Sequence, residues 1–159
     1  MRIAVLPLLT ALVASVFGFA VPAQATKMNG MQFFVLNGTC DKLVVGNLDW
    51  TASCDGKLMS TSYSNRRVGF HFITKDAKGA SFSGMDGANP SKDADVTNID
   101  EVILDTVGAG KNPKPFEATG KCLYSNPYTG DPTTVSCSGK MKDGRTFSAI
   151  FTTDGSPPQ

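Results

Sequence analysis

The sequence predicts an all-β protein, a small antiparallel barrel or sandwich of about eight strands. Glycine is frequent, with 16 residues, and turn-forming Asn, Asp and Ser recur at short intervals between apolar segments. Within those segments apolar side chains recur at every second position, as at Val68, Phe70 and Phe72. Long amphipathic helical patterns are missing from the sequence. Composition does not distinguish a closed barrel from a two-sheet sandwich.

The predicted strands lie between turn residues. Gly38 interrupts the first strand, where we expect a bulge or a close approach of two backbones. Helix competes with strand over 96–107, because Thr97 and Asp100 resemble a capping box. The run Val102-Ile103-Leu104 favours a strand there. The eight expected strands are 32–45, 50–60, 66–74, 80–85, 96–107, 116–124, 133–141 and 146–153.

The chain contains an internal duplication, which relates residues 33–78 to residues 113–154. An acidic insert, 79–112, separates the two units. A chance similarity between two glycine-rich segments is the alternative, but six identities in the same order with one single-residue gap favour duplication. The third strands also match, Arg67–Thr74 with Arg145–Thr152. The six matched pairs are Phe34/Phe116, Gly38/Gly120, Cys40/Cys122, Cys54/Cys137, Gly56/Gly139 and Lys57/Lys140.

Residues 1–25 have the pattern of a cleaved secretory signal peptide. A basic start precedes a long apolar stretch, Pro22 and a small-residue cleavage site that ends at Ala25. A transmembrane anchor is the competing interpretation, but no cationic stop-transfer cluster follows. We therefore expect a periplasmic or secreted domain over 26–154 with no membrane span after cleavage, followed by a disordered tail, 155–159.

Charge excludes two classes of partner. Without Arg2 the chain has 14 basic and 14 acidic residues, so a nucleic-acid binder and a protein held to anionic membrane by charge are both disfavoured. The acids concentrate over 86–101, and their spacing raises the possibility of calcium binding. Asn98 and Leu104 stand where an EF-hand needs Gly and Glu, so a solvated acidic loop is favoured.

Four cysteines in a short exported chain predict two disulfides with three possible pairings. The duplication selects one pairing, because each unit contains two cysteines at matching places on neighbouring strands. We therefore expect the bonds Cys40–Cys54 and Cys122–Cys137, each closing a loop of about 15 residues and stabilising the fold by about 3 kcal/mol. The chain has no Cys-x-x-Cys motif, so a redox role is disfavoured.

Catalytic, metal and cofactor motifs are missing from the sequence. His71 is the only histidine and lies mid-strand on the face opposite Phe70 and Phe72, where a solvent-facing or hydrogen-bonded histidine is expected. A lone histidine beside oxidised cysteines leaves too few ligands for zinc. A hydrolase that uses paired carboxylates remains an alternative.

Tyr128 is the one candidate for a partner-binding loop. It lies in the segment that Cys122 and Cys137 enclose, although a tyrosine packed on its own hairpin is the simpler interpretation. The sequence thus favours a non-enzymatic binding or structural protein of the cell envelope or extracellular space, which contacts another exported protein or an envelope component. The alternatives are the carboxylate hydrolase and a carrier of a small apolar ligand inside a barrel. The sequence does not indicate the oligomeric state.

Overall fold

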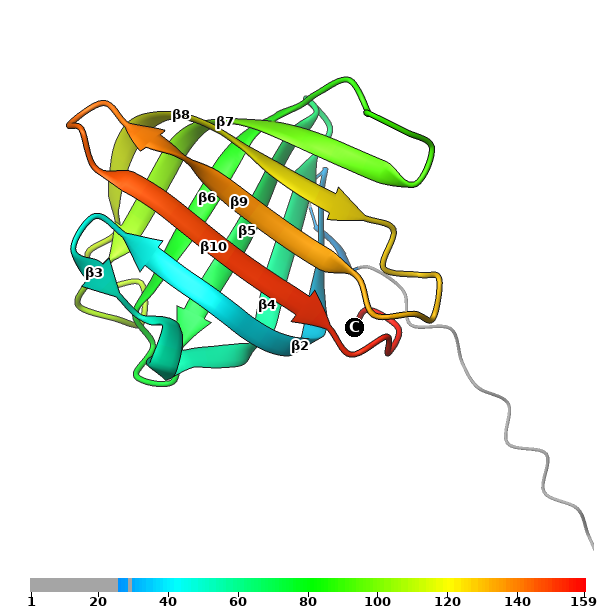
Figure 1. The fold of residues 1–159 in the computed structure, drawn as a ribbon, viewed down its shortest axis with the longest axis horizontal. Coiled ribbons are helices and arrows are strands. Elements are labelled where there is room, and N and C mark those ends of the chain that lie inside the picture. The colour runs from blue at the N-terminus through cyan, green and yellow to red at the C-terminus, as the bar shows by residue number, and fades with distance from the viewer. Residues whose placement is uncertain (1–25, 29) are drawn as a thin grey trace, which may run out of the picture.

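Eight long strands form a closed antiparallel barrel in this computed structural model, which describes residues 26–28 and 30–159 (Figure 1). Residues 1–25, with the predicted signal peptide, lie outside the described residues. Successive strands pair as neighbours from β4 to β10, and β2 closes the circle between β10 and β4. The barrel strands are β2 (Met31–Val45), β4 (Cys54–Tyr63), β5 (Arg67–Thr74), β6 (Gly79–Asp86), β7 (Ala94–Asp105), β8 (Lys114–Ser125), β9 (Thr134–Met141) and β10 (Thr146–Thr153).

The all-β prediction is confirmed, and of its two alternatives the structure has the barrel. The stretch that we assigned to strand over helix is indeed strand β7. The predicted strand at 50–60 begins later, at Cys54, because the amides of Ser53 and Cys54 both donate to the carbonyl oxygen of Trp50. These bonds form the short 3₁₀ turn η1 (Thr51–Ser53).

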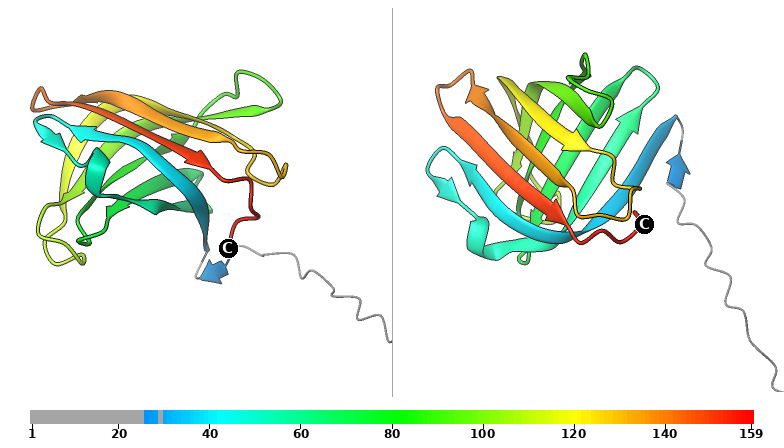
Figure 2. Two further views of the ribbon diagram at one scale, coloured as in Figure 1. Left: turned by 60° about the horizontal axis from the view of Figure 1, so that its bottom comes forward. Right: turned by 45° about the vertical axis from the view of Figure 1, so that its right-hand side comes forward.

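Strand β2 closes the barrel by changing its partner halfway along its length. Residues 31–37 pair with β4, and residues 38–45 pair with β10 (Figure 2). Gly38 lies at the change, where a Cβ atom would overlap the carbonyl oxygen of Thr152. The close backbone approach expected at Gly38 is therefore confirmed. Two short strands, β1 (Thr26–Met28) and β3 (Leu48–Asp49), also pair with β2.

Phenylalanine rings fill the interior of the barrel. Phe72 and Phe82 meet edge to face with 5.6 Å between ring centroids, and Phe82 stacks on Phe147 at 5.0 Å. Phe70 and Phe151 are equally buried. Each such ring stabilises the fold by about 1.5–3 kcal/mol through burial.

The two units that the sequence predicts to be duplicated fold as three-strand meanders, β2-β4-β5 and β8-β9-β10. Our alignment of their third strands is wrong by one position. It matches Phe70, which faces the interior, with Ser148, which faces outward between buried Phe147 and Ala149. A strand shifted by one residue exchanges its two faces, so identity at Arg67 and Arg145 does not imply equivalent positions in the barrel.

The tail, 155–159, is ordered, which corrects our expectation of disorder. The amide of Val35 donates to the carbonyl oxygen of Gln159 at 2.8 Å, and the amide of Gln159 donates to the carbonyl oxygen of Val35 at 3.0 Å. Pro158 is fully buried. The tail therefore continues the backbone pairing of β10 along β2. Its hydrogen-bonded backbone groups and the buried ring of Pro158 offset the conformational entropy lost when the tail is ordered.

Candidate functional site

The predicted pairing of the cysteines is the pairing in the structure, but the two disulfides occupy different settings. Cys122 and Cys137 lie directly opposite each other in the β8–β9 ladder, with 4.0 Å between their Cα atoms. Both are fully buried. This bond therefore joins strands that the sheet already pairs.

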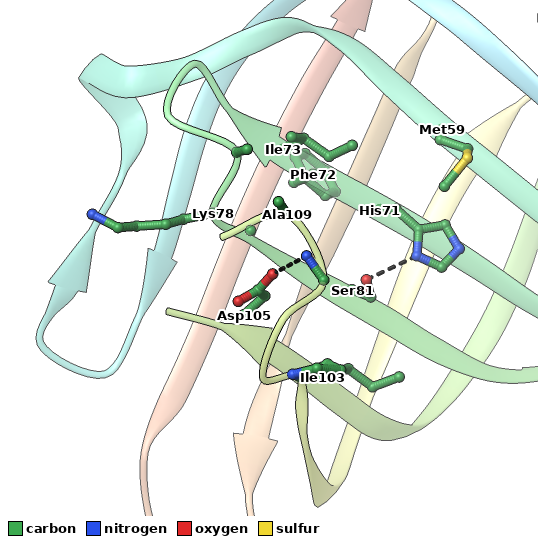
Figure 3. Close-up of a pocket in the computed structure, with 13 residues that line it drawn as sticks. Met59, His71, Phe72, Ile73, Lys78, Ser81, Ile103, Asp105 and Ala109 are labelled. Carbon is green, nitrogen blue, oxygen red and sulfur yellow. Dashed lines mark hydrogen bonds between the residues drawn. The ribbon is translucent and has the colours of Figure 1, made fainter. Parts of the chain in front are cut away.

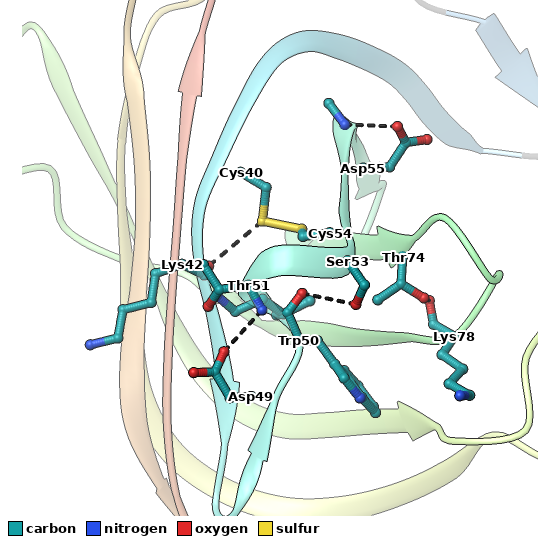
Figure 4. Close-up of a disulfide and its surroundings, with 12 residues drawn as sticks. Cys40, Lys42, Asp49, Trp50, Thr51, Ser53, Cys54, Asp55, Thr74 and Lys78 are labelled. Carbon is teal, nitrogen blue, oxygen red and sulfur yellow. Dashed lines mark hydrogen bonds between the residues drawn. A yellow bond between two sulfur atoms is a disulfide. The ribbon is translucent and has the colours of Figure 1, made fainter.

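The Cys40–Cys54 bond joins β2 and β4 beyond the end of their ladder. Pairing of β2 with β4 ends at Asn37 and Lys57, so neither Cys40 nor Cys54 has its cross-strand partner in the other strand. The bond holds the start of β4 and the turn η1 against β2, with 5.9 Å between Cα atoms (Figure 4). The amide of Leu43 donates to the hydroxyl of Thr51 at 3.1 Å on the same turn. Two disulfides in one small domain indicate an oxidising compartment outside the cytoplasm.

Tyr128 lies in the loop between β8 and β9, and its side chain is 54 % exposed. Its ring does not pack only on its own hairpin, because Phe34 of β2 lies 6.4 Å away between ring centroids.

The acidic segment is a separate feature, in which Asp86 contacts Arg66 and Asp100 forms a bidentate ion pair with Arg67. The residues described, 26–28 and 30–159, contain no group of three or more acidic, His or Cys side chains that could hold a metal.

The outer face of the barrel differs between its two sides. Strands β8, β9 and β10 present mainly polar residues outward, such as Lys121, Ser138 and Lys140, with Leu123 and Ile150 as exceptions. On the other side, one row of cross-strand neighbours is largely apolar. This row contains Val35, Met59, His71, Ser81, Ile103 and Pro115, from β2 and β4 through β8 in spatial order.

A groove of about 370 Å³ follows part of that row, and we call it the outer groove (Figure 3). The turn between β5 and β6 and the loop between β7 and β8 form its walls. Ile73, which projects outward at its edge, is 40 % exposed. The lining residues are Met59, His71, Phe72, Ile73, Ala77, Lys78, Gly79, Ser81, Ile103, Asp105, Ala109, Gly110 and Pro113.

His71 lies in the floor of the outer groove between two hydroxyl groups. Its Nδ1 is 2.8 Å from the Ser81 hydroxyl, and its Nε2 is 3.0 Å from the Thr61 hydroxyl. Burial lowers the pKa of His71, so the ring is neutral at pH 7. With both nitrogens engaged, His71 is the hydrogen-bonded histidine that the sequence suggested.

Asp105 organises the loop that walls the outer groove. Its carboxylate accepts hydrogen bonds from the amides of Val107, Gly108 and Gly110, at 3.1, 2.7 and 2.6 Å. The Gly108 amide, aided by those of Gly110 and Val107, lowers the pKa of the Asp105 carboxyl. Asp105 is therefore an ionised structural anchor, with its oxygens committed to the backbone of the loop.

Hydrogen bonds hold several surface carboxyl groups in their ionised form. In the part of the chain that the structure describes, every Asp or Glu with a resolved shift has a lowered pKa, through hydrogen bonds from neighbouring groups. A carboxylate hydrolase needs one acid with a raised pKa beside an ionised one.

The outer groove was not predicted from the sequence, although the sequence contained a signal for it. A strand with one solvated face alternates apolar and polar residues, whereas Val102-Ile103-Leu104 is continuously apolar. Because Val102 and Leu104 face the interior, Ile103 has to be covered on the outside or remain exposed. The walls of the groove gave no such signal, since they depend on two turns that are about 30 residues apart in sequence.

No protein-family model, curated protein or solved structure matched this chain in three comparisons. Over residues 26–28 and 30–159, no helix is long and apolar enough to cross a membrane. Fold and site together define a small, disulfide-stapled, up-and-down β-barrel with an apolar core and an apolar groove on its outer wall.

Proposed function

We propose that this chain is exported to the periplasm or the extracellular space and works there as a non-enzymatic binding protein. Its partner is another exported protein or an envelope component, which contacts the outer groove. The two disulfides support export, because such bonds persist in oxidising compartments.

The observation that carries this proposal is an apolar groove whose polar groups are already satisfied. The ring nitrogens of His71 have two hydroxyl neighbours, and the Asp105 carboxylate holds three amides. A partner that covers the groove therefore removes apolar surface from water without leaving a buried donor or acceptor without a hydrogen bond.

The volume of the groove also fits a binding role. At about 370 Å³ it lies in the range of small-molecule sites, which span roughly 300–1,000 Å³.

Affinity capture with matched variants tests the proposal. Immobilised protein comprising residues 26–159 is incubated with envelope and extracellular fractions of the source organism. We expect a ligand or partner that the wild type and Ile150→Lys retain but Ile73→Lys loses. Ile150 is a matched control because it also faces outward, on the polar side. Equal retention by Ile73→Lys and the wild type would contradict the proposal.

Tyr128→Ala separates the outer groove from the predicted binding loop in the same experiment. Tyr128 lies at the opposite end of the barrel from the turns that wall the groove. If the groove is the binding surface, Tyr128→Ala retains the partner as the wild type does. Loss of the partner through Tyr128→Ala alone would move the interface to the loop.

A further inference from the structure

Both charged side chains that line the outer groove are already engaged by other groups of the protein. These side chains belong to Lys78 and Asp105. The Lys78 ammonium pairs with the Asp76 carboxylate, with 2.8 Å from Nζ to Oδ2. The Asp105 carboxylate accepts hydrogen bonds from three backbone amides of its own loop. A charged ligand would therefore lose its hydration in the groove without gaining a free counter-charge.

The uncharged polar side chains of the groove are engaged as well. His71 is neutral at pH 7, because burial lowers its pKa, and its ring nitrogens lie 2.8 and 3.0 Å from the hydroxyls of Ser81 and Thr61. A ligand thus gains its affinity here from apolar contact rather than from hydrogen bonds. The remaining lining residues are apolar or glycine, namely Met59, Phe72, Ile73, Ala77, Gly79, Ile103, Ala109, Gly110 and Pro113.

Charges of both signs surround the outer groove. Glu101 lies one cross-strand row away from Ile103 on the same outward face of β7, opposite Ser83. Lys75 and Lys78 belong to the turn between β5 and β6. These neighbours favour neither an anion nor a cation at the groove.

The shape of the groove favours a small molecule over a polypeptide segment. The β5–β6 turn and the β7–β8 loop meet where the amide of Ala109 donates to the carbonyl oxygen of Ala77 at 2.8 Å. Both alanines line the groove, so their contact closes it at the end where β6 begins (Figure 3). A peptide lying across the strands would need a path open at both ends. The volume of about 370 Å³ lies within the range of small-molecule sites.

We propose that the outer groove binds an uncharged, apolar small molecule. The body of the ligand lies against Met59, Ile73 and Ile103, and the joined turn and loop enclose one of its ends. The β-branched side chains of the two isoleucines have few rotamers, and the walls are already hydrogen-bonded, so binding costs little conformational freedom. The inference rests on the proposed binding function and names the chemistry of the ligand for the same groove.

Titration with three matched cyclohexane derivatives tests the proposal, using ¹⁵N-labelled protein comprising residues 26–159. Methyl cyclohexanecarboxylate is uncharged, cyclohexanecarboxylate is an anion and cyclohexylmethylammonium is a cation. We expect the ester to shift the amide signals of Ile73, Ile103 and Ala109. The two charged compounds should bind at least about tenfold more weakly, because each would lose hydration without a free counter-charge.

Variants at two outward-facing isoleucines assign the binding to the groove. Ile73→Ala removes part of the apolar wall and should weaken ester binding about threefold or more. Ile150→Ala, on the polar side of the barrel, is the matched control and should bind as the wild type does. Ile73→Lys places a free ammonium at the edge of the groove, so it should weaken the ester and reduce its advantage over the carboxylate. Circular dichroism verifies that each variant folds, and the comparison of the three compounds needs no variant.

Equal or tighter binding of either charged compound would overturn the uncharged ligand. Ester shifts confined to residues outside the groove, or no shifts at all, would overturn the groove as a small-molecule site. In each case the capture experiment could still identify a polypeptide partner that Ile73→Lys loses, and the binding function would then stand. Failure of the binding function itself is recognised separately, by equal retention of partners by Ile73→Lys and the wild type.

Discussion

The amide of Ala109 donates a 2.8 Å hydrogen bond to the carbonyl oxygen of Ala77, and both alanines have positive φ, +57° and +62°. This contact joins the β7–β8 loop to the β5–β6 turn and so builds the wall of the outer groove. A left-handed backbone costs an L-residue roughly 1–2 kcal/mol. Of the three non-glycine residues with positive φ in the described chain, two meet here. Strain of this kind gathers where function requires a set geometry.

Glycine at position 109 should relieve this strain. Ala109→Gly removes the steric cost of positive φ but makes the unfolded chain more flexible by about 0.4–1 kcal/mol. We expect the free energy of unfolding to stay level or to rise by up to about 1 kcal/mol in urea titrations. Ala118→Gly in strand β8 is the control and should lower it. Equal destabilisation by the two changes would mean that Ala109 is not strained.

His71 should make stability depend on pH. Burial lowers its pKa in the folded state, so the unfolded chain takes up the proton first as pH falls through about 6.5. The stability that neutral His71 contributes is thus complete above about pH 6.5, and it is lost progressively below that value, down to the pKa of the folded state. His71 is the only histidine, so His71→Gln should remove this slope of the unfolding free energy between about pH 7.5 and 5.

The same substitution has a cost at neutral pH. Replacing the ring disturbs the hydroxyl contacts of Thr61 and Ser81, for which we expect a loss of about 1–3 kcal/mol at about pH 7.5. Urea titrations at several pH values measure the cost and the slope together. An unchanged slope in His71→Gln would assign the pH dependence to carboxyl groups.

Removal of the two disulfides should have different effects on local hydrogen exchange. Removing either pair, as Cys40→Ala with Cys54→Ala or as Cys122→Ala with Cys137→Ala, should lower the unfolding free energy by about 3 kcal/mol. Loss of Cys40–Cys54 should also increase hydrogen exchange over 46–54, because that bond joins β2 and β4 where no ladder hydrogen bonds pair them. Exchange in the β8–β9 ladder should change less when its bond is lost. Identical exchange patterns would contradict this distinction.

Gly38 should tolerate no side chain. In Gly38→Ala the new Cβ would overlap the carbonyl oxygen of Thr152, so we expect a loss of about 3 kcal/mol in urea titrations. Gly130→Ala is the control, because a Cβ at that position would meet no atom within 4 Å and only the positive φ of +84° opposes the change. We expect about 1–2 kcal/mol there. A smaller loss at Gly38 than at Gly130 would contradict the closure of the barrel at this residue.

Much of the fold follows from local sequence patterns. Period-two alternation located the strands, and the duplication selected the cysteine pairs. The alignment failed at the third strand because identity at Arg67 and Arg145 carries no information on which face is buried. The ordered tail was missed because Pro158 and Gln159 look like a flexible end until β2 supplies their partners.

The outer groove could not be predicted from the sequence for a different reason. Met59, His71, Ser81 and Ile103 are neighbours only across strands, and their row exists only once the register is set. Ala77 and Ala109 gave no signal at all, since alanine is not a residue from which positive φ is expected.

Photocrosslinking in the producing cells tests the binding role of the outer groove most directly. A benzophenone amino acid is placed at position 73, on the rim of the outer groove, or at position 150, on the polar side of the barrel. We expect crosslinked adducts of the exported protein from position 73 and none from position 150. Comparable adducts from both positions, or adducts from position 150 alone, would contradict the outer groove as the binding surface.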